Sequence, residues 1–176
     1  MAVGRMRGIG GAVVSIAWIA SALGASAQES TNRVAANTDW SVFVESGECW
    51  GVSEPKETVN TRDGKPAQVS RSQILLFVTY RAGGAKGEVS FTGGYPFAEG
   101  STVSMALDSG NFELFTDGEW AWPANPEDDA KILAAMKAGT KAVLQARSGR
   151  GTQTKDTFSL LGFTASVTEA EKRCAS

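Results

Sequence analysis

The sequence predicts a mainly β fold, an antiparallel β-sandwich with two short peripheral helices. Many short apolar segments alternate with glycine-rich turns, a pattern typical of antiparallel sandwiches and barrels. Most gaps between these segments are too short for the crossover helices that parallel strands need. A closed barrel is the alternative arrangement of the same strands, and we favour the sandwich.

The N-terminus has the features of a secretory signal peptide at residues 1–27. Arg5 and Arg7 precede an apolar segment at residues 9–23, and Ala25-Ser26-Ala27 supplies the small residues that a signal peptidase reads. A membrane anchor is the alternative, but the small residues of the segment and its cleavage-like end argue against it. We therefore expect a periplasmic, secreted or cell-surface protein.

The mature chain is predicted to consist of a flexible arm at residues 28–38 and a single domain at residues 39–176. Without the leader, 15 basic and 19 acidic residues remain, which gives a net charge of −4. No basic run or stripe is present, so nucleic acid and anionic membrane surfaces are poor candidates as partners. We expect no integral membrane span after the leader is cleaved.

Cys49 and Cys174 are the two cysteines, one near each end of the predicted domain. An exported chain reaches an oxidising compartment, so we expect a disulfide between them. In the chain-entropy model, closing a loop of about 125 residues stabilises the fold by roughly 5 kcal/mol at most. Two unrelated thiols are the alternative. A metal-binding role is disfavoured because the chain lacks histidine and Cys-x-x-Cys spacing.

The densest apolar run of the mature chain, at residues 73–80, predicts a central core strand. The successive apolar residues 74–78 place bulk on both faces of an extended chain, so we expect cover on both sides of this strand. Before it, residues 40–45 and 48–52 predict two strands joined by a tight turn. Asp63-Gly64 predicts a hairpin of short edge strands.

Turn residues divide the second half of the chain into further strands. Residues 88–92 alternate apolar and polar side chains, which indicates a half-buried strand. Thr116-Asp117-Gly118 and the glycine-rich residues 148–151 are predicted turns between successive strands. The other predicted strands lie at residues 101–108, 112–115, 119–122, 141–147 and 154–160.

Two segments have helical signals. Asn125 is a good N-cap, Pro126 suits the first helical position, and Gly139 ends the helix. The apolar residues of this helix form a narrow stripe, so we expect it to lie over one edge of the sheet. After Gly162, apolar residues recur at helical spacing at Phe163, Val167, Ala170 and Cys174. This second helix should press its apolar face inward and bring its cysteine with it.

The absence of histidine excludes catalytic schemes built on Ser-His-Asp, Cys-His or His-metal groups. Ser53-Glu-Pro-Lys56 fits a Ser-x-x-Lys pattern, but its proline is unsuited to the helical turn that this chemistry needs. Glu113, Asp117 and Glu119 offer a carboxylate pair for an envelope hydrolase, although acids on a hairpin tip are more often solvated turn residues. We predict a protein that is not an enzyme and has no cofactor or metal.

Aromatic and arginine side chains near turns are the predicted binding residues. Tyr95, Phe97, Trp120 and Trp122 cluster around turns, and aromatic residues left at a surface often mark contacts. The alternative is that alternate members of this group fill the sandwich core. Arg147 and Arg150 frame the last turn, where they would bind carboxylates within the chain or on a partner.

Sequence motifs from about residue 40 to residue 174 are similar to those of a known family. They are Glu48-Cys-Trp50, the strand that ends at Tyr80, residues 88–97, Phe115-Thr-Asp-Gly118 with Ala121-Trp122, Ala134-Ala-Met136 with Gly139, and Arg150-Gly-Thr-Gln-Thr-Lys-Asp156 leading to Phe158-Ser-Leu-Leu-Gly-Phe163. Together they resemble the invasion-associated locus B family of exported alphaproteobacterial proteins. The motifs are specific to that family but not to any reaction.

The resemblance implies an immunoglobulin-like β-sandwich in the periplasm or at the cell surface, with Cys49 bridged to Cys174. It carries over no catalytic residues. The family is named after a link to host-cell invasion, so the expected function is a non-enzymatic binding protein. Its partner would be a protein or glycan of the envelope or of a host surface. A purely structural envelope protein is a further alternative to the hydrolase.

Overall fold

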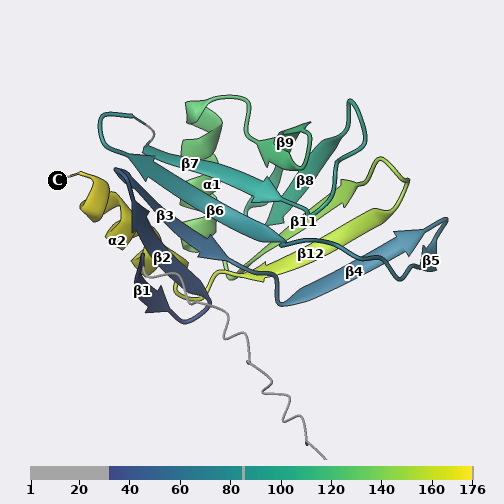
Figure 1. The fold of residues 1–176 in the computed structure, drawn as a ribbon, viewed down its shortest axis with the longest axis horizontal. Coiled ribbons are helices and arrows are strands. Elements are labelled where there is room, and N and C mark those ends of the chain that lie inside the picture. The colour runs from purple at the N-terminus through teal and green to yellow at the C-terminus, as the bar shows by residue number, and fades with distance from the viewer. Residues whose placement is uncertain (1–31, 85, 176) are drawn as a thin grey trace, which may run out of the picture.

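The computed structural model describes residues 32–84 and 86–175, so the predicted signal peptide at residues 1–27 lies outside the described part of the chain. The described part is built mainly from short strands, with two helices (Figure 1). The strands are β1 (Arg33–Asn37), β2 (Trp40–Glu45), β3 (Glu48–Ser53), β4 (Glu57–Arg62), β5 (Lys65–Pro66), β6 (Leu75–Arg81), β7 (Lys86–Thr92), β8 (Thr102–Leu107), β9 (Gly110–Asp117), β10 (Trp120–Trp122), β11 (Lys141–Arg147) and β12 (Gln153–Ser159). The helices are α1 (Pro126–Ala138) and α2 (Phe163–Cys174).

The strands form one open sheet in the order β1-β2-β3-β6-β7-β10-β9-β8-β11-β12-β4-β5. Every pair of neighbouring strands is antiparallel. Most connections are tight turns, as the short gaps in the sequence require. The predicted mainly β, antiparallel fold with two short helices is confirmed. The immunoglobulin-like arrangement stays a prediction, because the strands are joined in a single continuous sheet.

The sheet curls so that distant strands face each other across the core. Phe91 in β7 and Phe158 in β12 meet edge to face, with ring centroids 6.1 Å apart, although several strands separate them in the sheet order. The indole N–H of Trp40 in β2 donates to the carbonyl of Ser159 in β12 over 2.9 Å. All three aromatic side chains are buried. The two arms of the sheet therefore share one apolar interior, as the layers of a sandwich do.

Helix α1 begins and ends where its sequence signals predict. The side chain of Asn125 accepts a hydrogen bond from the backbone N–H of Asp128, and Gly139 is the C-cap. The stripe formed by Ile132, Leu133 and Met136 is buried. However, α1 packs on β7, which lies between β6 and β10 inside the strand order (Figure 1). The expectation that it lies over an edge of the sheet was wrong, because a narrow stripe limits the contact area but not its position.

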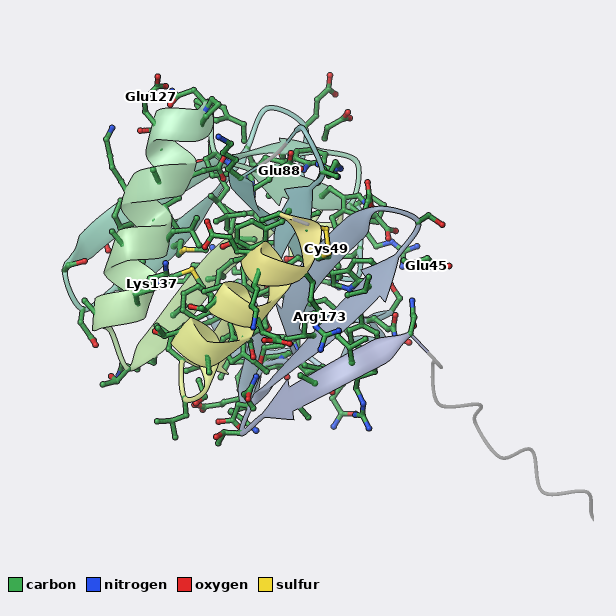
Figure 2. The ribbon with its side chains drawn as sticks, turned by 90° about the vertical axis from the view of Figure 1, so that its left-hand side faces the viewer. Glu45, Cys49, Glu88, Glu127, Lys137 and Arg173 are labelled. Atoms are coloured by element: carbon green, nitrogen blue, oxygen red, sulfur yellow. A yellow bond between two sulfur atoms is a disulfide. The ribbon has the colours of Figure 1, made fainter. Side chains whose placement is uncertain are left out.

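Helix α2 covers the inner face of β2 and β3 and carries the disulfide (Figure 2). Its predicted apolar face of Phe163, Val167, Ala170 and Cys174 is buried. Cys174 forms a disulfide with Cys49 in β3, which confirms the predicted pairing. The bridge joins residues that are 125 positions apart in the sequence. The last helix is thereby fixed covalently to an early strand.

Two expectations about strands were wrong. Residues 33–37, predicted as part of a flexible arm, form β1, because their backbone pairs with β2 and the Asn37 amide donates to Ser166 in α2 over 3.0 Å. The central strand β6 was expected to have cover on both sides. Only Leu76, Val78 and Tyr80 are buried, whereas the alternate residues of β6 are partly exposed. Phe77 therefore lies on a face of the sheet that packing leaves open.

Candidate binding surfaces

The outer face of β2, β3, β6 and β10 carries a group of aromatic side chains. Residues directly opposite each other on paired strands share a face. Phe43 is opposite Trp50, and Trp50 is opposite Thr79, which lies two residues from Phe77. Trp120 is opposite Thr92 in β7, on the same face. We call the surface formed by Phe43, Trp50, Phe77, Trp120 and Trp122 the outer aromatic face.

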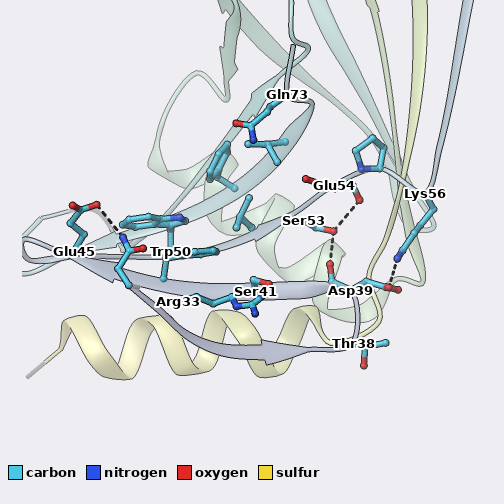
Figure 3. A pocket seen from close by; sticks show the side chains of 16 residues that line it. Arg33, Thr38, Asp39, Ser41, Glu45, Trp50, Ser53, Glu54, Lys56 and Gln73 are labelled. Atoms are coloured by element: carbon cyan, nitrogen blue, oxygen red, sulfur yellow. Dashed lines mark hydrogen bonds and ion pairs between the residues drawn. The ribbon is translucent and has the colours of Figure 1, made fainter. Parts of the chain in front are cut away.

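The rings of the outer aromatic face contact one another while staying partly accessible. Phe43 and Trp50 are stacked, with centroids 5.8 Å apart and an interplanar angle of 9°. Phe77 and Trp120 are 5.7 Å apart, and Trp120 is 40% exposed. Two hollows, of about 700 and 320 Å³, lie on this face, and both include Trp50 and Phe77 in their linings. Figure 3 shows the larger hollow. A ligand could therefore lie flat against several rings at once.

Ion pairs lie at both ends of the outer aromatic face, and Arg33, Glu45 and Glu54 also line its larger hollow. The Arg81 guanidinium bonds Glu48 over 2.6 Å and Glu88 over 3.1 Å. At the other end Lys56 forms an ion pair with Asp39 (Figure 3), and this contact lowers the pKa of the Asp39 carboxyl. Because these ion pairs are internal, the centre of the face offers apolar rings and small hydroxyl groups. Its chemistry suits an uncharged, amphipathic ligand.

A separate hollow, of about 640 Å³, lies between the end of β4, the segment before β6 and the turn after β11. We call it the arginine cleft. Its lining includes Arg62, Arg71, Tyr95, Glu119, Ser148, Arg150 and Thr152. The Arg62 guanidinium donates to the Thr152 hydroxyl over 2.7 Å. Three arginines and one acidic residue line the cleft, so it is more basic than the outer aromatic face.

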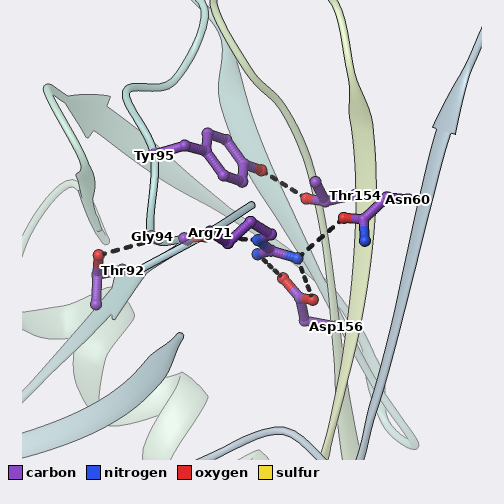
Figure 4. Close-up of polar contacts among 8 residues, drawn as sticks. Asn60, Arg71, Thr92, Gly94, Tyr95, Thr154 and Asp156 are labelled. Atoms are coloured by element: carbon purple, nitrogen blue, oxygen red, sulfur yellow. Dashed lines mark hydrogen bonds and ion pairs between the residues drawn. The ribbon is translucent and has the colours of Figure 1, made fainter. Parts of the chain in front are cut away.

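A buried ion pair anchors the arginine cleft (Figure 4). The Arg71 guanidinium donates to both carboxylate oxygens of Asp156, over 2.8 and 2.6 Å, and also to the carbonyl of Gly93 over 2.8 Å. The two side chains are 6% and 0% exposed. Burial raises the pKa of the Asp156 carboxyl, and the guanidinium opposes this rise. The pair ties the segment before β6 to β12.

Tyr95 connects this ion pair to the cleft. Its ring lies over the Arg71 guanidinium at 5.0 Å, and its hydroxyl lies 2.5 Å from the Thr154 hydroxyl. Burial raises the pKa of the Tyr95 phenol. At this position the ring packs against a delocalised cation and also lines the cleft. The Tyr95 side chain therefore packs against the buried ion pair and also exposes part of its surface to the cleft.

The structure divides the five predicted binding residues between these surfaces. Tyr95 and Arg150 line the arginine cleft, and Trp120 and Trp122 belong to the outer aromatic face. Arg147 is exposed at the end of β11, outside the linings of both. Each surface also contains residues that sequence reasoning missed: Phe43, Trp50 and Phe77 on the face, and Arg62 and Arg71 in the cleft. The missed aromatic residues lie within predicted strands, where an apolar side chain is normally expected to be buried in the core.

The acidic residues considered for catalysis do not come together in one hollow. Glu119 lines the arginine cleft, whereas the Glu113 carboxylate accepts a hydrogen bond from Thr102 in β8 over 2.5 Å. In the Ser-x-x-Lys segment, the Ser53 hydroxyl donates to the Asp39 carbonyl over 2.7 Å. Among the described residues, no group of three or more histidine, cysteine or acidic side chains is arranged to hold a metal ion.

Comparison of the sequence with protein families gives a match. A family model described as "Invasion associated locus B (IalB) protein" matches residues 65–171. The chain belongs to the IalB family. The match runs from β5 into α2 and includes Trp120, Trp122 and all the lining of the arginine cleft except Arg62. Both cysteines of this IalB protein lie outside the matched range, Cys49 well before its start and Cys174 shortly after its end.

Comparison with curated proteins gives no match, and comparison with solved structures gives none either. Within residues 32–84 and 86–175, neither helix is long and apolar enough to cross a membrane.

Proposed function

We propose that this IalB protein is an exported, non-enzymatic binding protein whose binding surface is the outer aromatic face. The observation that carries the proposal is the gathering of five partly accessible aromatic rings from four strands on one face of the sheet. A soluble domain gains stability by burying such rings, so a surface that presents them contiguously is typical of a contact site. The family name favours a contact with the bacterial envelope or with a host cell.

The chemistry of the face favours a glycan as the partner. Aromatic rings bind the flat apolar face of a sugar, while its hydroxyl groups need polar neighbours. Thr79 and Ser41 supply hydroxyl groups beside the rings, and the ion pairs of Arg81 lie at the rim. Neighbouring strands are about 4.8 Å apart, so the rings from β2 to β10 extend over about 19 Å across the sheet. That length suits a short run of sugar units better than a single small molecule.

Export is the second part of the proposal. The leader-like residues 1–27 support it, and so does the disulfide between Cys49 and Cys174, because such bridges persist in oxidising compartments. Together they favour the periplasm or the cell surface as the place where the protein binds. A cell fractionation experiment that detects the mature chain with its first 27 residues removed would support this localisation, and retention of the leader on a cytoplasmic protein would contradict it.

The binding proposal can be tested by pull-down from envelope extracts and from host-surface extracts. Extract treated with protease and extract oxidised with periodate separate protein partners from glycan partners. We expect the parent to retain its partner after protease treatment and to lose it after periodate. The Trp120→Ala/Trp122→Ala variant should recover much less, whereas Leu161→Ala removes an apolar side chain that is 61% exposed elsewhere and should recover as much as the parent. Equal recovery by the tryptophan variant would contradict the proposed surface.

A further inference from the structure

We propose that the arginine cleft is a separate binding site for a small organic oxyanion, a molecule that carries a carboxylate or a phosphate group. This inference does not depend on the outer aromatic face, which has a different chemistry. The cleft of about 640 Å³ has the size typical of small-molecule sites. Arginine side chains from two different elements border it, Arg62 at the end of β4 and Arg150 in the turn before β12.

The two bordering arginines have unused binding capacity. Within the described part of the chain, neither Arg62 nor Arg150 forms an ion pair with an acidic side chain. Arg62 uses one of its N–H groups on the Thr152 hydroxyl, and a guanidinium has five such donors. Two cations beside one cleft repel each other, and an oxyanion between them would remove that repulsion. Planar guanidinium groups bind carboxylates and phosphates through paired hydrogen bonds.

The third arginine of the cleft is already satisfied and has a different role. Arg71 is bound by the Asp156 carboxylate and by backbone, so its charge is neutralised inside the protein. Breaking such a buried pair would leave an uncompensated charge, which makes this part of the cleft rigid. The ring of Tyr95 lies over the same guanidinium. The cleft therefore has a fixed inner wall and two free cations at its border.

The remaining lining indicates that the ligand is larger than a bare ion. Tyr95 and Pro96 supply apolar surface for an organic body. The Ser148 oxygen accepts a hydrogen bond from the Thr152 backbone N–H over 3.1 Å, and its O–H remains a donor. Glu119 adds an acceptor for a ligand hydroxyl and lowers the net positive charge of the cleft. These features fit an organic oxyanion that also has hydroxyl groups, such as a sugar acid or a sugar phosphate.

Isothermal titration calorimetry on the mature protein tests this site. The compounds are glucuronate, glucose 1-phosphate, inorganic phosphate and uncharged glucose. We expect at least one of the two organic anions to bind, bare phosphate to bind more weakly, and glucose not to bind. Whichever organic anion binds more tightly identifies the class as carboxylate or phosphate ester. The Arg62→Gln/Arg150→Gln variant should lose about tenfold or more in affinity.

Matched variants make the result decisive. Arg147→Gln removes the same charge from a nearby exposed position outside the cleft and should leave affinity unchanged. Arg150→Gln alone keeps the Arg62 contact with Thr152, so it reports on binding if the double variant fails to fold. Trp50→Ala should bind the anion normally even if it abolishes partner recovery. Absence of binding to both organic anions, unchanged affinity in Arg150→Gln, or an equal loss in Arg147→Gln would each overturn the proposed site.

Discussion

Arg71 shows how one polar residue can organise an apolar fold. The Arg71 side chain is 6% exposed and the side chain of its partner, Asp156, is 0% exposed, so both charges have lost most of their water. Such a pair need not add stability overall, but removing one partner typically costs about 3–5 kcal/mol. The contacts with Gly93 and Asn60 satisfy further donors of the guanidinium. The pair therefore fixes where the segment between β5 and β6 can lie.

The two tyrosines predict an alkaline limit to stability. Burial, and to a smaller extent the negative charge of Glu171, raise the pKa of Tyr80 to about 12, and burial also raises the pKa of Tyr95. In the unfolded chain both phenols ionise near pH 10. The stability contributed by neutral Tyr80 is therefore fully present below about pH 10 and is lost as pH rises towards 12. At about 1.4 kcal/mol for each pKa unit, the loss reaches about 2–3 kcal/mol.

Tyr80 and Tyr95 are the two tyrosines of the chain, and ultraviolet titration of the folded protein should show that the pKa of each phenol is raised, to about 12 for Tyr80. The free energy of unfolding, measured by chemical denaturation between about pH 9 and 12, should fall as pH rises. Tyr80→Phe, which cannot ionise, should reduce that slope. A tyrosine that titrates at its ordinary pKa in the folded state would contradict the predicted burial effect.

Gly162 lies between β12 and α2, where β1 approaches its backbone closely. Its φ of +87° is in the left-handed region, and a Cβ at this position would overlap the carbonyl oxygen of Asn37 in β1. We expect Gly162→Ala to destabilise the protein because it combines backbone strain with displacement of β1. Gly151→Ala is the matched control, since Gly151 has a φ of +82° but open space around it.

The control substitution should cost about 1–2 kcal/mol from backbone strain alone. Gly162→Ala should cost about 2 kcal/mol more than that, a difference that chemical denaturation can measure. Hydrogen exchange should also show lower protection of the β1 amides in Gly162→Ala. Equal costs for the two variants would mean that β1 does not depend on its close approach to Gly162.

Local signals predicted those elements whose information lies in neighbouring residues. The cap at Asn125, the turn at Asp63-Gly64 and the 3.6-residue spacing in α2 each specify their structure within a few positions. Strand β1 was missed because Arg-Val-Ala-Ala-Asn has weak strand propensity, and its pairing with β2 and contact with α2 supply the stability. The face of a strand that packing leaves open is likewise decided by the tertiary structure.

At the scale of the whole molecule, the candidate surfaces were predicted only in part. Trp120 and Trp122 drew notice because they lie close together near a turn, whereas Phe43, Trp50 and Phe77 come from separate strands that only the sheet order brings together. The arginine cleft likewise joins Arg62 to a turn almost ninety positions away, at Arg150. A single sequence contains the residues of such a surface but not the register that assembles them.

The disulfide links this assembly to the compartment in which it would work. Cys49 and Cys174 connect β3 to α2 across 125 positions, so the bridge restricts the unfolded chain over most of the domain. We expect the Cys49→Ala/Cys174→Ala variant to lose about 2–5 kcal/mol of stability, measured by guanidinium denaturation. Alanine is the suitable replacement because both cysteines are buried, with 1% and 9% exposure.

Reductant provides the control for this prediction. The parent should lose a similar amount of stability when it is reduced, whereas the double variant should not respond to reductant at all. Under the proposed export, a precursor in a reducing cytoplasm would be held in the less stable form, which favours transfer across a membrane before the bridge forms. If reduction leaves the unfolding midpoint of the parent unchanged, the packing of α2 on β2 and β3 is sufficient alone, and the bridge cannot couple stability to export.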